Sequence, residues 1–223
     1  MEARQQAAER TFPACGAGRR VLVTGGLCAA AVLLPGVINL ALAGPTVGAW
    51  HGLVLKRPSP AVALHDTNGL PVALEDLRGQ TIFLMFGYLR CPERCHTQAA
   101  TLHAFATAVE APDVRFLFVA LDPDHDNAAE LAAYFDARDP RFRALLPPSR
   151  SAAAALAEQF RSPVHYGPGD DGRVQPVAHA GHVFVIDPGG VVRLVYPAGR
   201  LSVDALLADW QRAQTAWNTL LET

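Results

Sequence analysis

The sequence predicts an α/β domain with a mixed central sheet flanked by helices, preceded by one transmembrane helix. Three observations support this fold class. An uncharged apolar run of 23 residues lies near the start of the chain, two shorter apolar runs have the character of buried strands, and segments with helical spacing separate and follow them. The length of 223 residues allows one ordinary domain beside the apolar run.

Composition excludes several classes of protein. Half of the residues are hydrophobic and 18% are charged, which excludes a fully disordered chain. The 18 glycines and 17 prolines show no three-residue period, which excludes a collagen-like repeat. The net charge is −2 and the pI is about 6.4, so the chain lacks a global basic footprint and we expect no nucleic-acid partner.

The first element is the apolar run Val21–Ala43, which is long enough for a helix to cross a bilayer. The tail at 1–20 has a net charge of +2, and Arg19 and Arg20 adjoin the run. The positive-inside rule then predicts a single-pass protein of the bacterial inner membrane, with a cytoplasmic tail and a periplasmic C-terminal domain. Ala41–Ala43 also has the form of a signal-peptide cleavage site, but the run exceeds a usual signal core, so we favour a retained anchor.

The periplasmic part is expected to begin with a linker at 44–57, followed by one domain at 58–223. Alternating residues within Pro60–Leu74, on either side of the turn signal at 66–69, predict a small hairpin. The continuous apolar run Thr81–Phe86 is typical of a fully buried central strand.

The middle of the domain alternates between helix and strand. Apolar residues at helical spacing predict a helix over 96–110, and Val114–Leu121 is a second buried strand. Two further helices are expected at Asn127–Ala137 and Ser151–Phe160.

The domain ends with a hairpin and a helix. Two strands, His182–Ile186 and Val191–Tyr196, flank a turn, and Ser202 caps a helix that continues to Leu221. This order of elements is the thioredoxin-type arrangement. Right-handed crossovers make the two central strands parallel, so the loop after Thr81–Phe86 emerges at the carboxyl edge of the sheet.

That loop carries the chemistry. Of four cysteines, Cys15 lies in the tail and Cys28 in the apolar run, which leaves Cys91 and Cys95 in the exported domain. On a helix, residues four apart share a face, so the two thiols can hold one metal ion or close a disulfide. A position at a helix start is expected to lower their pKa values. Because there is no second cysteine pair, two thiolates completed by one histidine suit a low-coordinate copper ion better than a four-ligand zinc or iron site.

Three spaced motifs carry a family resemblance. The first is Phe86–Thr97, which reads FGYLRCPERCHT; the second is Leu121–Asn127, which reads LDPDHDN; the third is Val177–Ala180, which reads VAHA, with Pro188 nine residues after the histidine. In these motifs the chain resembles the SCO/SenC proteins, which are membrane-anchored copper chaperones for the copper A centre of cytochrome c oxidase.

The resemblance implies a copper ion as cargo and Cys91, Cys95 and His179 as its ligands. The implied partners are the oxidase subunit that carries the copper A site, other copper chaperones or thiol reductants, and the membrane. His96 stands where the family has proline, and Ala178 where it has aspartate. His96 or His182 could supply an alternative nitrogen ligand; strand alternation over the three residues from His179 to His182 would let only one of them face the cysteines.

Two other functions remain open at this point. Cys91 and Cys95 could form the redox pair of a thiol–disulfide oxidoreductase, which would not need His179. A peroxide-handling thiol protein is also possible, with Arg90 or Arg94 as the cation beside a reactive cysteine. Copper delivery, by contrast, involves no chemical turnover.

Overall fold

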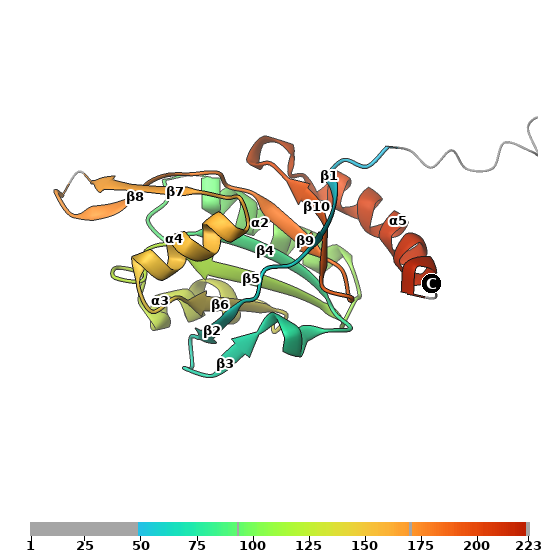
Figure 1. Ribbon diagram of the computed structural model, residues 1–223, viewed down its shortest axis with the longest axis horizontal. Helices are drawn as coiled ribbons and strands as arrows, with labels where there is room; N and C mark the ends of the chain where they lie inside the picture. The colour runs from blue at the N-terminus through green and yellow to red at the C-terminus, as the bar shows by residue number, and fades with distance from the viewer. Residues whose placement is uncertain (1–48, 93, 170, 222–223) are drawn as a thin grey trace, which may run out of the picture. The chain divides into compact units, whose positions relative to one another are not determined.

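The computed structural model describes residues 49–221 apart from 93 and 170 (Figure 1). The predicted tail at 1–20 and the predicted anchor at 21–43 lie outside these residues. Within the described part of the chain, no helix has the length and apolarity that a membrane crossing needs.

The domain is built on a mixed sheet of eight strands. β4, β5 and β6 are parallel to one another, and every other pair of neighbours is antiparallel. In spatial order the strands are β1 (Leu53–Pro58), β10 (Val191–Tyr196), β9 (Val183–Ile186), β4 (Thr81–Gly87), β5 (Val114–Ala120), β6 (Phe142–Leu146), β2 (Ala63–Asp66) and β3 (Pro71–Ala73). This confirms the predicted thioredoxin-like fold with parallel central strands.

Central strand β4 is buried on both faces, as its continuous apolar sequence predicts. Its side chains alternate between two cores. Phe83 and Met85 belong to one core, and Ile82, Leu84 and Phe86 belong to the other. A strand held from both sides in this way is a firm support for the loop that follows it.

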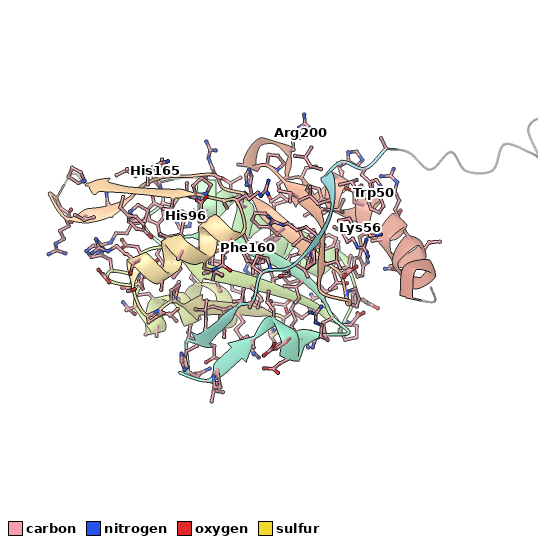
Figure 2. All side chains as sticks on the ribbon, in the orientation of Figure 1. Trp50, Lys56, His96, Phe160, His165 and Arg200 are labelled. Atoms are coloured by element: carbon pink, nitrogen blue, oxygen red, sulfur yellow. The ribbon has the colours of Figure 1, made fainter. Side chains whose placement is uncertain are left out.

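Helices cover both faces of the sheet (Figure 1). α2 (Arg94–Ala108) and α5 (Val203–Leu221) pack on one core, where Phe105 of α2 contacts Phe83. α4 (Arg150–Gln159) packs on the other, and Phe160 at its end, labelled in Figure 2, packs against the rings of Phe86 and Phe184.

Short polar side chains cap three helices. Ser202 accepts from the N–H of Ala205 at the start of α5, as predicted. Ser149, which was not predicted as a cap, accepts from the N–H of Ala152 at the start of α4. Asn127 caps α3 (Ala128–Leu131), which continues as a π-helical turn, η2 (Ala132–Asp136). Two short 3₁₀ turns, η1 (Leu74–Leu77) and η3 (Ala198–Arg200), complete the elements.

The expected linker at 44–57 differs from the structure, because its second half contains strand β1, which pairs with β10. The residues just before β1 are also tied down. The backbone N–H groups of His51 and Gly52 donate to the buried carboxylate of Asp209 on α5, which also accepts from the hydroxyl of Tyr196. Long-range pairing of this kind leaves no local signal in the sequence.

Three further strands were not predicted. β6 joins the parallel part of the main sheet, whereas β7 (Val164–Pro168) and β8 (Val174–His179) pair with each other in a separate two-stranded sheet. This hairpin extends from the domain at the left of Figure 1. Both of its strands contain proline, which argues against a strand when the sequence is read alone.

Candidate metal centre

Cys91 and Cys95 lie where β4 passes into α2, Cys91 in the connecting loop and Cys95 in the first turn of the helix. The two cysteines form no disulfide, and both side chains are about 5% exposed or less. The N–H of Cys91 donates to the carbonyl of Tyr88 at 3.2 Å, and the N–H of Cys95 donates to Sγ of Cys91 at 3.4 Å. The turn therefore holds both sulfurs on one side, as the four-residue spacing predicts.

Gly87, the last residue of β4, makes room for this arrangement. A Cβ at this position would lie 2.7 Å from the ring of Phe118 and 3.0 Å from Sγ of Cys95. Any larger residue would push the helix start away from the strand. The close packing of Cys95 against the end of β4 therefore requires glycine at position 87.

His179 is the last residue of β8 and comes to the cysteines from the other side. Its Nε2 lies 3.3 Å from Sγ of Cys95, and its Nδ1 accepts from the N–H of Gly181 at 3.2 Å. The ring also packs edge-on against Tyr88, with centroids 5.9 Å apart. One ligand atom from each of Cys91, Cys95 and His179 lies within 4.8 Å of the other two, so this group could hold a metal ion.

Burial dominates the electrostatics of the site. The hydrogen bond between the Cys95 thiol and Cys91, together with burial, raises the pKa of Cys95 above its ordinary value. The expectation that the helix start lowers its pKa is therefore wrong for Cys95 in the metal-free protein. Burial and the nearby charges of Cys91 and Cys95 also raise the pKa of Tyr88 to about 12, so its hydroxyl stays protonated.

The second motif, which directly follows β5, supports the cysteine loop. The carboxylate of Asp126 accepts from the N–H of Leu89 at 3.1 Å, and the N–H of Leu121 donates to the carbonyl of Gly87 at 2.7 Å. Asp126 is 3% exposed, and burial raises its pKa to about 7. Asp122 is also buried; it accepts from Nδ1 of His125 at 2.8 Å if that nitrogen carries a proton.

The two alternative histidines have other neighbours. Nδ1 of His96 lies 2.7 Å from the hydroxyl of Tyr134. The ring of His182 packs against Phe184, and burial followed by the charge of His179 lowers its pKa. β9 begins only at Val183, so the predicted alternation along a strand from His179 to His182 does not apply.

The sequence analysis did not identify two residues that complete the surroundings of His179. Gln98, one turn after Cys95 on α2, donates from Nε2 to the carbonyl of Gly181 at 2.6 Å. Gly181 in turn contacts the His179 ring. Of these two residues, only Gln98 could have been found from the sequence, because a polar residue on the apolar face of a helix is unusual.

A groove of about 710 Å³ opens beside the thiols. Its lining includes Cys91, Pro92 and Thr97 from the cysteine loop and α2, and Val177 and His179 from β8. Cys91 therefore borders a space from which an ion or a partner could reach it, although little of its side chain is exposed.

The fold and this cluster together define a thioredoxin-like domain in which two cysteines and one histidine that could hold a metal ion meet at the carboxyl edge of the sheet. The family model for SCO1/SenC matches residues 58–214. The chain belongs to the SCO1/SenC family, which confirms the resemblance found in the sequence motifs.

Known proteins agree with this assignment. Protein SCO2 homolog, mitochondrial, of Mus musculus is 27% identical over 163 residues, which cover 71% of this chain and 63% of that protein. The chain spans less than two thirds of the length of the first curated relatives that it matches.

Two solved structures share the fold. The solution structure of apo Sco1 from Thermus thermophilus is 27% identical, with a TM-score of 0.63 over 76% of this chain and 99% of that one. Bradyrhizobium japonicum ScoI with copper bound is 25% identical, with a TM-score of 0.60 over 70% of this chain and 98% of that one.

Proposed function

We propose that this protein binds one copper ion through Cys91, Cys95 and His179 and delivers it to the copper A centre of cytochrome c oxidase during assembly. The observation that carries the proposal is the convergence of two thiols, which form no disulfide, and one imidazole within 4.8 Å of one another, from two separate parts of the fold. Thiolates are soft ligands that favour Cu(I), and three donors suit its low coordination number.

The comparisons support copper as the cargo. The B. japonicum relative is described with copper bound, and the three ligand candidates of this chain lie in family motifs. The acceptor is proposed from the family resemblance, which implies an oxidase subunit with a copper A site. The bordering groove gives such a partner access to Cys91.

Copper binding is tested on the detergent-solubilised chain by measuring copper per protein under reducing and oxidising conditions. We expect about one copper in the reduced form and little in the oxidised form, because metal binding needs thiolates and a disulfide sulfur is a poor ligand. Equal loading of both forms would contradict the thiolate site.

Delivery is tested in a bacterium that lacks this protein. We expect the oxidase to assemble without copper in its copper A centre, and plasmid-borne protein to restore the absorption of that centre. If the deletion strain grown at low copper still makes oxidase with a complete copper A centre, delivery is contradicted, and copper storage or a redox function would be left.

The location is part of the proposal. We propose that Val21–Ala43 anchors the protein in the bacterial inner membrane with the metal site in the periplasm, because Arg19 and Arg20 adjoin one end of this uncharged run. Intact-mass measurement of membrane extracts is expected to find the run still attached. A soluble protein that starts near Gly44 would show cleavage instead.

Thiol–disulfide exchange is a second candidate, favoured by the hydrogen bond between Cys95 and Cys91 and by the position of Cys91 at the groove. The two candidates differ in their need for His179. A His179→Ala variant that still reduces a partner disulfide at the native rate and still supports oxidase assembly would favour exchange over copper delivery.

A further inference from the structure

A series of polar contacts connects two residues of helix α2, Gln98 and Cys95, through Gly181 and the ring of His179. Gln98 Nε2 donates to the carbonyl of Gly181 at 2.6 Å, and the Gly181 N–H donates to Nδ1 of His179 at 3.2 Å. Nε2 of the same ring lies 3.3 Å from Sγ of Cys95, three residues before Gln98. The imidazole is therefore oriented by the helix that also carries a thiol.

The orientation of the Gln98 amide follows from its partner. A carbonyl can only accept, so the amide nitrogen must face Gly181 and Oε1 must be the other atom. Gln98 is 2% exposed, and its Oε1 is buried without a hydrogen-bond partner among the described residues. A buried acceptor is costly to leave unpaired, so it is available for a donor that arrives in another state of the site.

The Gly181 N–H also decides where the ring proton of neutral His179 lies. Because a backbone donor faces Nδ1, that nitrogen is the acceptor and the proton lies on Nε2, directed at the Cys95 sulfur. A copper ion on Nε2 needs the lone pair of that nitrogen, so the neutral ring must then carry its proton on Nδ1. If the backbone kept its metal-free orientation, two donors, Nδ1–H and the Gly181 N–H, would then face each other.

We propose that the peptide between Ala180 and Gly181 turns over when copper binds, with Gln98 and Gly181 as the positioning residues of this switch. This inference rests on the proposed copper function. The N–H and C=O of a peptide point in opposite directions, so turning it presents the Ala180 carbonyl to Nδ1–H. The Gly181 N–H no longer donates to His179 and donates to Oε1 of Gln98 instead. The ring proton moves from Nε2 to Nδ1 through solvent, and no electron is transferred.

Glycine is the residue that such a switch requires at 181. Its φ is +59°, a left-handed conformation, and turning the preceding peptide carries φ into the ordinary negative range. Only glycine adopts both at similar energy. Copper uptake and release are thereby coupled to one local rearrangement rather than to movement of the whole β7–β8 hairpin.

The first test is Gln98→Glu, with Gln159→Glu at an exposed position of α4 as the matched control. A carboxylate cannot donate to the Gly181 carbonyl but can accept the Gly181 N–H, so it favours the turned peptide. In the metal-free, reduced chain at about pH 8, ¹⁵N NMR reports which nitrogen of the His179 ring carries the proton. We expect Nε2 in the native protein and the control, and Nδ1 in Gln98→Glu.

Copper association is expected to be about fivefold faster in Gln98→Glu, the worth of one net hydrogen bond, since the peptide is already turned. Gly181→Ala provides a second variant, because a side chain disfavours the positive φ and thus the metal-free orientation. It is expected to shift the ring proton in the same direction.

A native metal-free protein with the proton on Nδ1, or variants that both keep it on Nε2, would overturn the switch. This NMR result needs no copper, so it separates the switch from the proposed function. If the tautomer shifts as expected but no copper binds to any form, the copper function fails and the positioning roles of Gln98 and Gly181 stand.

Discussion

The thiol half and the imidazole half of the site are built differently. Cys91 and Cys95 follow a strand that is buried on both faces, and hydrogen bonds with the segment after β5 hold their loop. His179 ends a strand that pairs only with β7 among the described residues, outside the eight-stranded sheet. His165, labelled in Figure 2, lies on that partner strand and is exposed.

This difference teaches that the site combines a rigid pair of donors with a third donor on a less supported element. Packing fixes the sulfurs before any ion arrives, whereas the imidazole is placed by its contacts with Cys95 and Gly181, and Gln98 of α2 holds Gly181 in turn. Elements with few buried contacts are the ones that open at low free-energy cost. Such a division is suited to a protein that must both hold and release its cargo.

The strongest test of the comparison removes one donor from the rigid half. Cys91→Ser or Cys95→Ser is expected to abolish copper binding, since one thiolate and one imidazole bind a soft ion poorly. The loss should exceed the ~10–100-fold that removal of an outer partner of a metal site costs. Copper content after dialysis measures it, with Cys15→Ser as the matched control. Near-native copper loading of either variant would contradict a site that needs both thiolates.

The second test removes the donor of the other half. His179→Ala is expected to lose most of the copper affinity but to keep a thiolate-bound ion at high copper, while His182→Ala binds as the native protein does. X-ray absorption on both loaded variants measures the copper–nitrogen contribution. A nitrogen signal that survives in His179→Ala and vanishes in His182→Ala would assign the ligand to His182.

The third test concerns the support of the rigid half. The pKa of Asp126 is about 7 in the folded protein, above the ordinary 3.8, so the folded state holds a proton that the unfolded state has released between these values. The free energy of unfolding should fall as pH rises from about 4 to 7, by at most ~1.4 kcal/mol per pH unit from this group.

Asp126→Asn should remove this dependence, since an amide oxygen can still accept from the Leu89 N–H. Urea unfolding of the metal-free protein across this pH range measures it. If native protein and variant respond identically to pH, the buried carboxyl is not the group responsible.

The smallest effect is expected at Tyr88, which contacts both halves through a hydrogen bond to Cys91 and ring packing on His179. Tyr88→Phe keeps the ring and loses the hydroxyl, so copper affinity should fall by no more than about tenfold. Tyr88→Ala should weaken it further, because the ring contact is also lost. Competition with a copper chelator measures the copper affinities of the two variants. Equal losses would assign the whole effect to the hydroxyl.

Local patterns predicted the thiol half well. Buried strands β4 and β5 are continuous apolar runs, and the helix that carries Cys95 has its apolar residues at helical spacing. The four-residue spacing of the cysteines fixes their common side. The raised pKa of Cys95 was not predictable in this way, because burial by residues distant in the sequence outweighs the helix start.

The imidazole half could not be predicted from local patterns. β7 and β8 are short and contain glycine and proline, and their pairing is a tertiary event. Only motif spacing selected His179 among eight histidines. Gly181 and Gln98 act on that ring through contacts between segments more than eighty residues apart in the chain.

The β7–β8 hairpin also bears on solubility. Val174 and Val177 on β8 are 48% and 53% exposed, and a projecting strand with exposed valines invites pairing with the same strand of another molecule. Pro176 lies between them and has no N–H to donate, and the pairing with β7 is irregular at the same place. Proline cannot donate to a ladder of strands, so Pro176 opposes continuous pairing along β8, the strand that ends at His179.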